Sequence, residues 1–243
     1  MNPLSAHDLL AVWEAGEDKH PLDRALTLLA TASPEQTWED LAALSIGRRD
    51  ASLLAVREQT YGPKLEGFVQ CPHCSESLEF DLTVADLVVE SSHGEKRALE
   101  LESDGYELRF RLPDSRDLAS LLGARDSTAA HDLLLERCVL KASRGGEPVE
   151  VGDLPAGVAA DLSVAMSEHD PQAEVLLDLL CPACEHRWQA LFDIVTFFWT
   201  ELANQAQRLL REVHALARAY GWREADILAM SARRRQFYME MAT

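Results

Sequence analysis

The stretches Cys71-Pro72-His73-Cys74 and Cys181-Pro182-Ala183-Cys184 decide the fold of this 243-residue chain. Each is a C-P-x-C pair, a spacing that lets two thiolates bind one metal ion from the same side. The only other cysteine, Cys138, stands by itself. Four thiolates are the usual ligand set of a structural zinc site, so Cys71, Cys74, Cys181 and Cys184 are the predicted ligands of a structural Zn²⁺ ion.

The residues that flank the pairs repeat at a spacing of 110 positions. CPHCSESLEFDL, which begins at Cys71, aligns with CPACEHRWQALF, which begins at Cys181. After Cys74 apolar and polar residues alternate, which is the period of a half-buried strand. Extended runs also precede the pairs, at residues 65–70 and 174–180. We therefore expect two β-hairpins with the cysteines at their tips, which together form one zinc ribbon.

Periodicity and capping signals divide the chain into five regions. The predicted regions are N-terminal helices at 1–62, a first hairpin at 63–90, an α+β insertion at 91–172, a second hairpin at 173–192, and a long helix with short terminal helices at 193–243. The predicted fold class is therefore α+β and mainly helical. A two-hairpin, four-cysteine zinc ribbon carries the large insertion, and a long C-terminal helix follows.

Several element boundaries depend on short local signals. Asp50 is expected to cap a helix over 50–61, and Ser127 or Thr128 a helix over 127–142. A three-residue turn at 103–105 is expected to join two strands of the insertion. The arginines at positions 48, 49 and 57 are expected on a solvated helix face.

The clearest helix runs from Val195 to Tyr220. Its apolar residues are spaced alternately by four and three positions over more than three heptads. Asp193 is the expected N-cap and Gly221 the expected stop. Such a seam must be buried, either within its own domain or against a partner chain.

Composition and charge restrict the class of protein. The chain is 47% hydrophobic and 26% charged, which is ordinary for a globular protein, and its formal net charge is −18. This charge disfavours binding to nucleic acids, which are polyanions. Residues 204–243 contain seven arginines and four acidic residues, so they carry about +3 and the remainder about −21. Two interpretations of the basic tail remain: it binds an acidic surface, or it is a solvated helix face with a helix C-terminus.

The N-terminal residues are not typical of a signal peptide, because a basic start is missing and acidic residues interrupt the apolar run. No run of about 18 apolar residues is present, so no membrane span is expected. We therefore expect a reducing compartment, in which paired cysteines favour metal over a disulfide.

The cysteine pairs also allow a redox interpretation. C-P-H-C occurs in thiol oxidants, but that chemistry requires the first cysteine at a helix N-terminus, and strand-like residues follow Cys74. His73 and His186 adjoin the pairs and are expected to face solvent or to support the ligands, with replacement of a cysteine as the alternative. Cys138 is expected in a helix core. No Ser/His/Asp set, HExxH, Walker A or GxGxxG motif is evident, so neither an enzyme nor a small-molecule substrate is predicted.

Three stretches resemble a known family. Residues 47–82, CPACEHRW at 181–188 and residues 209–241 are similar to T4-like phage baseplate proteins, also called baseplate hub assembly chaperones, whose relatives accompany phage-tail-like contractile injection systems. The C-terminal stretch is the most specific part of this resemblance. The N-terminal 45 or so residues and the insertion do not contribute to it.

The resemblance implies a non-enzymatic structural component or assembly factor of a contractile baseplate, which binds other baseplate or hub proteins. It implies the bacterial cytoplasm as the location, with retention in a phage-tail-like particle left open. Two alternatives from other classes remain: a zinc-ribbon adaptor that binds transcription or RNA-handling machinery, and a thiol-disulfide oxidoreductase.

Overall fold

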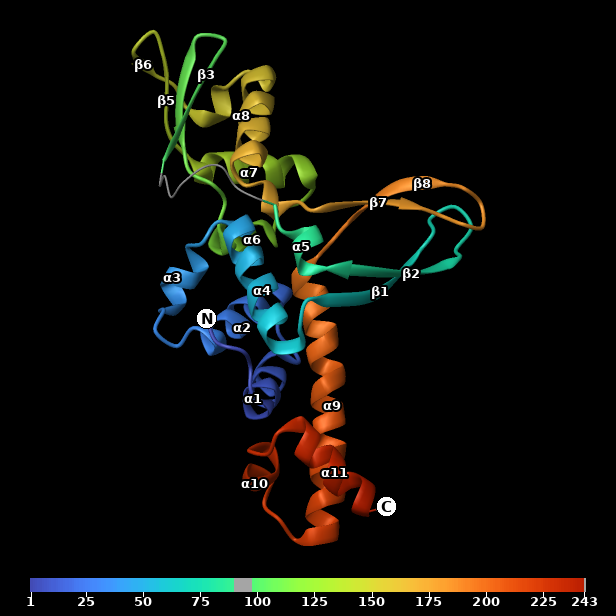
Figure 1. Cartoon of the computed structure of the whole chain (residues 1–243). Coiled ribbons are helices and arrows are strands. Elements are labelled where there is room, and N and C mark those ends of the chain that lie inside the picture. Colours follow the sequence, from blue (N-terminus) through green and yellow to red (C-terminus); the bar gives the residue numbers. More distant parts are fainter. Residues whose placement is uncertain (90–97, 243) are drawn as a thin grey trace. The chain divides into compact units, whose positions relative to one another are not determined.

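The computed structural model describes residues 1–89 and 98–242 (Figure 1). It is 56% helix and 19% strand, which confirms the predicted α+β, mainly helical class. The chain divides into two compact units, each assembled from segments that are distant in sequence. The first contains Met1–Thr37, Leu53–Pro63 and the residues from Asp193 onward, and the second contains Trp38–Ser52 and Lys64–Phe192. The predicted boundary at residues 90–91 lies outside the described residues.

The first unit is built from helices. They are α1 (Ala6–Gly16), α2 (Pro21–Ala32), the C-terminal part of α4 (Ile46–Tyr61), α9 (Ile194–Tyr220), α10 (Glu224–Leu228) and α11 (Ala232–Ala242). Their ends follow local signals. Ser5 and Asp8 form a capping box at the start of α1, and Asp193 accepts hydrogen bonds from the first turn of α9. Gly221 ends α9 in the left-handed region, at φ 69°.

The apolar seam of α9 is buried within its own unit. Leu202, Ala206, Leu209 and Leu216 are fully buried, and α1, α2, α10 and α11 pack against α9. The seam is therefore buried by helices of the same chain. Of the two possibilities, packing within its own domain and pairing with a partner chain, the structure shows the first. Only Tyr220, at the last position, is exposed, and its ring stacks on Trp222 at 4.5 Å.

Buried arginines tie these helices together. Arg57, which is 2% exposed, donates through Nε and Nη2 to the two carboxylate oxygens of Glu201, at 2.8 and 2.6 Å. Arg235 similarly donates to Glu212 at 2.9 Å. The expectation of a solvated arginine face is wrong for Arg57 and for Arg49, because both side chains are buried. A guanidinium tolerates burial where a bidentate carboxylate compensates the lost hydration.

The second unit combines helices with three small sheets. Its elements are α3 (Trp38–Ala42), the N-terminal part of α4, β1 (Lys64–Gln70), β2 (Ser77–Thr83), α5 (Val84–Leu87), β3 (Leu99–Ser103), β4 (Tyr106–Phe110), α6 (Ser115–Leu121), α7 (Ser127–Cys138), β5 (Val139–Arg144), β6 (Glu147–Pro148), α8 (Ala156–His169), β7 (Leu176–Leu180) and β8 (Arg187–Leu191), with 3₁₀ turns at Val151–Asp153 and Pro171–Ala173. β1 pairs with β2 and β7 with β8, which confirms the two predicted hairpins.

The insertion folds around its own core. Its antiparallel sheet has the order β3-β4-β5-β6 (Figure 1). Phe110, Cys138 and Leu162 are fully buried in the cluster that joins this sheet to α7 and α8. The β3–β4 turn contains two residues, Asp104 and Gly105, both with positive φ, where three were expected.

The expected helix over 127–142 is too long. α7 ends at Cys138, and Val139 begins β5, which pairs with β4 and completes the sheet. The β-branched Val139 suits this strand, and pairing with a distant strand overrides the helical pattern.

The start of α4 differs from the expectation because Ser45 and the distant Asp170 cap it together. The helix begins at Ile46 and includes Asp50, the expected cap. The carboxylate of Asp170 accepts from the backbone N–H of Gly47 at 2.8 Å and from the Ser45 hydroxyl at 3.0 Å. Ser45 in turn accepts from the N–H of Arg48 at 3.4 Å, so a local and a distant side chain share the first-turn N–H groups.

Candidate metal centre: a four-cysteine cluster

The first cysteine pair occupies a tight loop between β1 and β2. The backbone N–H of Cys71 donates to Glu76 O at 2.9 Å, and the N–H of Ser75 donates back to Cys71 O at 2.9 Å. Ser75 adopts the left-handed region at φ 62°. The chain therefore folds around the two sulfurs, with both side chains on the same side of the loop.

The second pair repeats this geometry between β7 and β8. The N–H of Cys181 donates to His186 O at 2.9 Å, and the N–H of Glu185 donates to Cys181 O at 2.9 Å. Glu185 has φ 57°. The repeat at a spacing of 110 residues is therefore present both in the amino-acid sequence and in the backbone hydrogen bonds.

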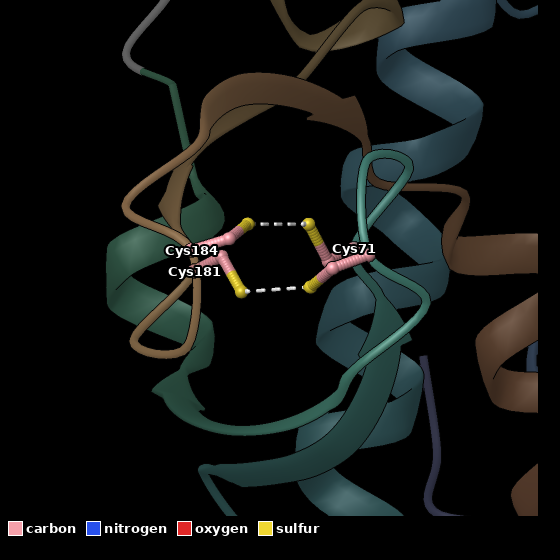
Figure 2. A group of neighbouring side chains, drawn as sticks. Cys71, Cys181 and Cys184 are labelled. Carbon is pink, nitrogen blue, oxygen red and sulfur yellow. Dashed lines mark hydrogen bonds between the residues drawn. The ribbon is translucent and has the colours of Figure 1, made fainter.

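The two loops bring their four sulfurs together. Cys71 Sγ lies 3.7 Å from Cys184 Sγ, and Cys74 Sγ lies 3.6 Å from Cys181 Sγ (Figure 2). All four sulfurs lie within 4.8 Å of one another. A tetrahedron with zinc–sulfur bonds of about 2.3 Å has sulfur–sulfur edges of about 3.8 Å, so the cluster has the size of a tetrahedral thiolate site.

Burial and charge at the cluster also suit a cation. Cys71 and Cys181 are buried, whereas Cys74 is exposed. Desolvation opposes the Cys71 thiolate, but the backbone N–H groups of Cys74 and His73 lower the pKa of Cys71 to about 7. The N–H of His186 lowers the pKa of Cys184, yet desolvation and the neighbouring sulfurs raise that pKa to about 12. Four thiolates at this distance therefore require positive charge between them, which a bound metal ion would supply.

The two histidines beside the cysteines lie outside this set of sulfurs. The ring of His73 stacks on that of His186 at 5.4 Å, and His186 stacks in turn on Trp188 at 5.9 Å. The group of side chains close enough to share one metal ion contains the four cysteines and neither histidine. The sequence alone did not predict this stack.

Cys138 lies in the insertion core, apart from the cluster. Burial raises the pKa of its thiol to about 12, and the carboxylate of Asp117 adds to the effect. Asp117 is itself fully buried and accepts hydrogen bonds from Arg111 and Arg137. Burial would raise the pKa of Asp117, but the hydrogen bond from Arg111 and that from the backbone of Asp114 lower it to about 2. Cys138 is therefore the buried core residue that its helical pattern predicted.

The structure also brings a serine, a histidine and an aspartate within hydrogen-bond distance, which the sequence did not reveal. His131 Nε2 lies 2.9 Å from Ser163 Oγ, and His131 Nδ1 lies 3.5 Å from Asp132 Oδ1. The histidine and aspartate side chains are exposed, and Ser163 Oγ also donates to the backbone carbonyl of Ala159 at 2.9 Å. These residues lie on the surfaces of α7 and α8. Their hydrogen bonds join two neighbouring helices.

The fold and the cysteine cluster define a class: a scaffold in which two hairpins meet at one thiolate site. A family described as "T4 bacteriophage base plate protein" matches residues 5–199, so the chain belongs to this family of phage baseplate proteins. No curated protein and no solved structure matches the chain. In the described ranges, no helix is long and apolar enough to cross a membrane.

The range of the family match differs from the residues that carried the resemblance. The match includes the N-terminal helices and the insertion, which did not contribute to the resemblance. It ends at Trp199, before the stretch 209–241, which is the most specific part of the resemblance. The match therefore covers the N-terminal helices, both hairpins and the insertion, but only the first residues of α9.

Proposed function

We propose that this protein is a non-enzymatic, zinc-stabilised structural component or assembly factor of the baseplate of a phage-tail-like contractile injection system. It binds other baseplate or hub proteins. The family match over residues 5–199 carries this proposal. It acts in the bacterial cytoplasm, where such particles assemble, and is retained in the particle if it is a subunit.

Zn²⁺ is the proposed metal because of the chemistry of the ligands. Cys71, Cys74, Cys181 and Cys184 would hold it with no open coordination position, which is typical of structural zinc and not of catalytic zinc. The metal would neutralise the thiolates and join two hairpins that are separated by more than 100 residues in sequence. Its binding free energy would thereby contribute to folding.

Two alternatives lack comparable support. An adaptor for transcription or RNA handling would need a basic surface, whereas the chain carries a net charge of −18. A thiol oxidoreductase would need the first cysteine at a helix N-terminus, and here Cys71 and Cys181 each follow a β-strand. Salt-dependent RNA binding in a gel shift would support the first, and reduction of insulin would support the second.

The decisive experiment combines assembly with metal analysis. A tagged copy in the native host should co-purify with baseplate or hub proteins and carry one zinc ion per chain. A strain without the gene should fail to assemble complete baseplates. Normal assembly of spike and sheath in that strain, together with no co-purified baseplate protein, would refute the proposed function.

A further inference from the structure

The outer face of the β1–β2 hairpin presents an exposed aromatic ring. The side chains of Leu65 and Val69 point to the half-buried inner face, and Phe68 points outward. Phe68 is 73% exposed, the highest value among the large hydrophobic side chains of residues 1–89 and 98–242. Burial of a phenylalanine side chain is stabilising, so this position leaves that stabilisation unused in the free chain.

Three carboxylates share this outer face with Phe68, and Lys64 lies at the start of the same face. Glu79 lies directly opposite Phe68 on β2, and Glu66 lies directly opposite Asp81. Like charges at directly paired positions destabilise a hairpin. No ion pair joins Glu66, Glu79 or Asp81 to a cation in the described part of the chain. A basic group placed against this face would therefore relieve a repulsion that the hairpin carries by itself.

This pattern is absent from the second hairpin, although its backbone repeats the first. The register places Asp178 opposite Gln189, where the first hairpin has Phe68 opposite Glu79. Gln189 donates to Asp178 at 3.1 Å. The cysteine loop therefore does not require an aromatic ring among carboxylates, and the face is particular to the first hairpin.

The face is also held in shape before any partner arrives. The ring of Phe80 packs over Gly67 on the inner side, where a Cβ on Gly67 would lie 2.4 Å from the ring. The cysteine loop closes the other end of the hairpin through its paired hydrogen bonds. Binding to a preformed surface loses less conformational entropy, which favours affinity.

We propose that the outer face of β1–β2 docks another baseplate protein, through an apolar pocket on that protein which receives Phe68 and is rimmed by lysine or arginine. The net charge of −18 favours a basic partner at long range and disfavours nucleic acids and anionic membranes. This inference rests on the proposed function for the source of the partner. It adds the surface used and the chemistry that the partner must have.

The test is pairwise co-expression of the full-length chain with each baseplate protein encoded beside it, followed by titration calorimetry on any complex. Phe68→Ala should weaken the complex at least 10-fold, as expected for a central aromatic anchor. Glu79→Lys should also weaken it, and the affinity should fall as salt rises. Leu122→Ala, which truncates another exposed apolar side chain, should leave the affinity unchanged.

The outcomes separate this proposal from the proposed function. Unchanged affinity of Phe68→Ala would overturn the docking surface and leave the baseplate role intact. Tighter binding by Glu79→Lys would overturn the basic character of the partner. No complex with any baseplate protein would overturn both. Equal metal content and equal melting temperature of Phe68→Ala and the wild type would show that the variant is folded.

Discussion

Replacement of Cys181 by serine should remove the metal and loosen the second unit. Cys181 is fully buried, and its sulfur lies 3.6 Å from that of Cys74. A serine hydroxyl is a poor zinc ligand compared with a thiolate, so the site would keep three ligands and lose affinity. The metal content should fall from one equivalent per chain to well below it.

The magnitude follows from the length of chain that the site closes. The two cysteine pairs enclose 106 residues. In the chain-entropy model, a cross-link that closes a loop of about 100 residues stabilises the folded state by about 4–5 kcal/mol. This value is an upper bound for a cross-link made by a bound metal ion. A loss of this size would lower the melting temperature by about 10–20 °C.

The assay is metal analysis by mass spectrometry together with thermal melting, with and without a chelator. The chelator should lower the melting temperature of the wild type towards that of Cys181→Ser and leave the variant unaffected. Cys138→Ala is the matched control, because it also removes a buried thiol but should retain all of the metal. A wild type that contains no metal, or a Cys181→Ser protein with full metal content, would refute the four-cysteine site.

Three further predictions concern single positions. Ser75→Gly and Glu185→Gly should each raise the free energy of unfolding by about 0.5–1 kcal/mol, because both residues have positive φ; lower stability in denaturant titration would contradict this. Gly221→Ala should lower stability by about 1 kcal/mol for the same reason, and an unchanged denaturation midpoint would count against the left-handed cap at the end of α9. Asp117→Asn should lower stability by about 2–3 kcal/mol at neutral pH, because two arginines lose their carboxylate. Since folding lowers the pKa of Asp117 from 3.8 to about 2, its stabilisation is present above pH 4 and is lost as pH falls to about 2, so the wild type and the variant should converge there; a constant difference in stability across that range would contradict the assignment.

Local signals predicted much of the fold. The C-P-x-C pairs with their alternating flanks predicted both hairpins and the cluster of sulfurs, because a tight loop and its strands depend on adjacent residues. The caps at Ser5, Asp193 and Gly221 likewise act within a few residues of the helices that they end. The zinc itself and the role of each cysteine as a ligand remain predictions.

The errors arose where distant residues decide local structure. The start of α4 depends in part on Asp170, more than 120 residues away, although Ser45 also caps it locally by accepting from the N–H of Arg48. The end of α7 depends on the pairing of β5 with β4. The burial of Arg57 depends on Glu201, which belongs to another helix. Hydrophobic periodicity contains no information on such partners, and they become visible only in three dimensions.

The separation of the two cysteine pairs also affects the order in which the protein is made. At a synthesis rate of about 5–20 residues per second, Cys181 and Cys184 leave the ribosome about 5–20 s after Cys71 and Cys74. The insertion, which has its own core, emerges during this interval. The first thiol pair must therefore avoid oxidation or capture by another chain until the second arrives. If the cluster binds zinc as proposed, the reducing and zinc-buffered state of the cell during translation becomes a condition for correct folding of this chain.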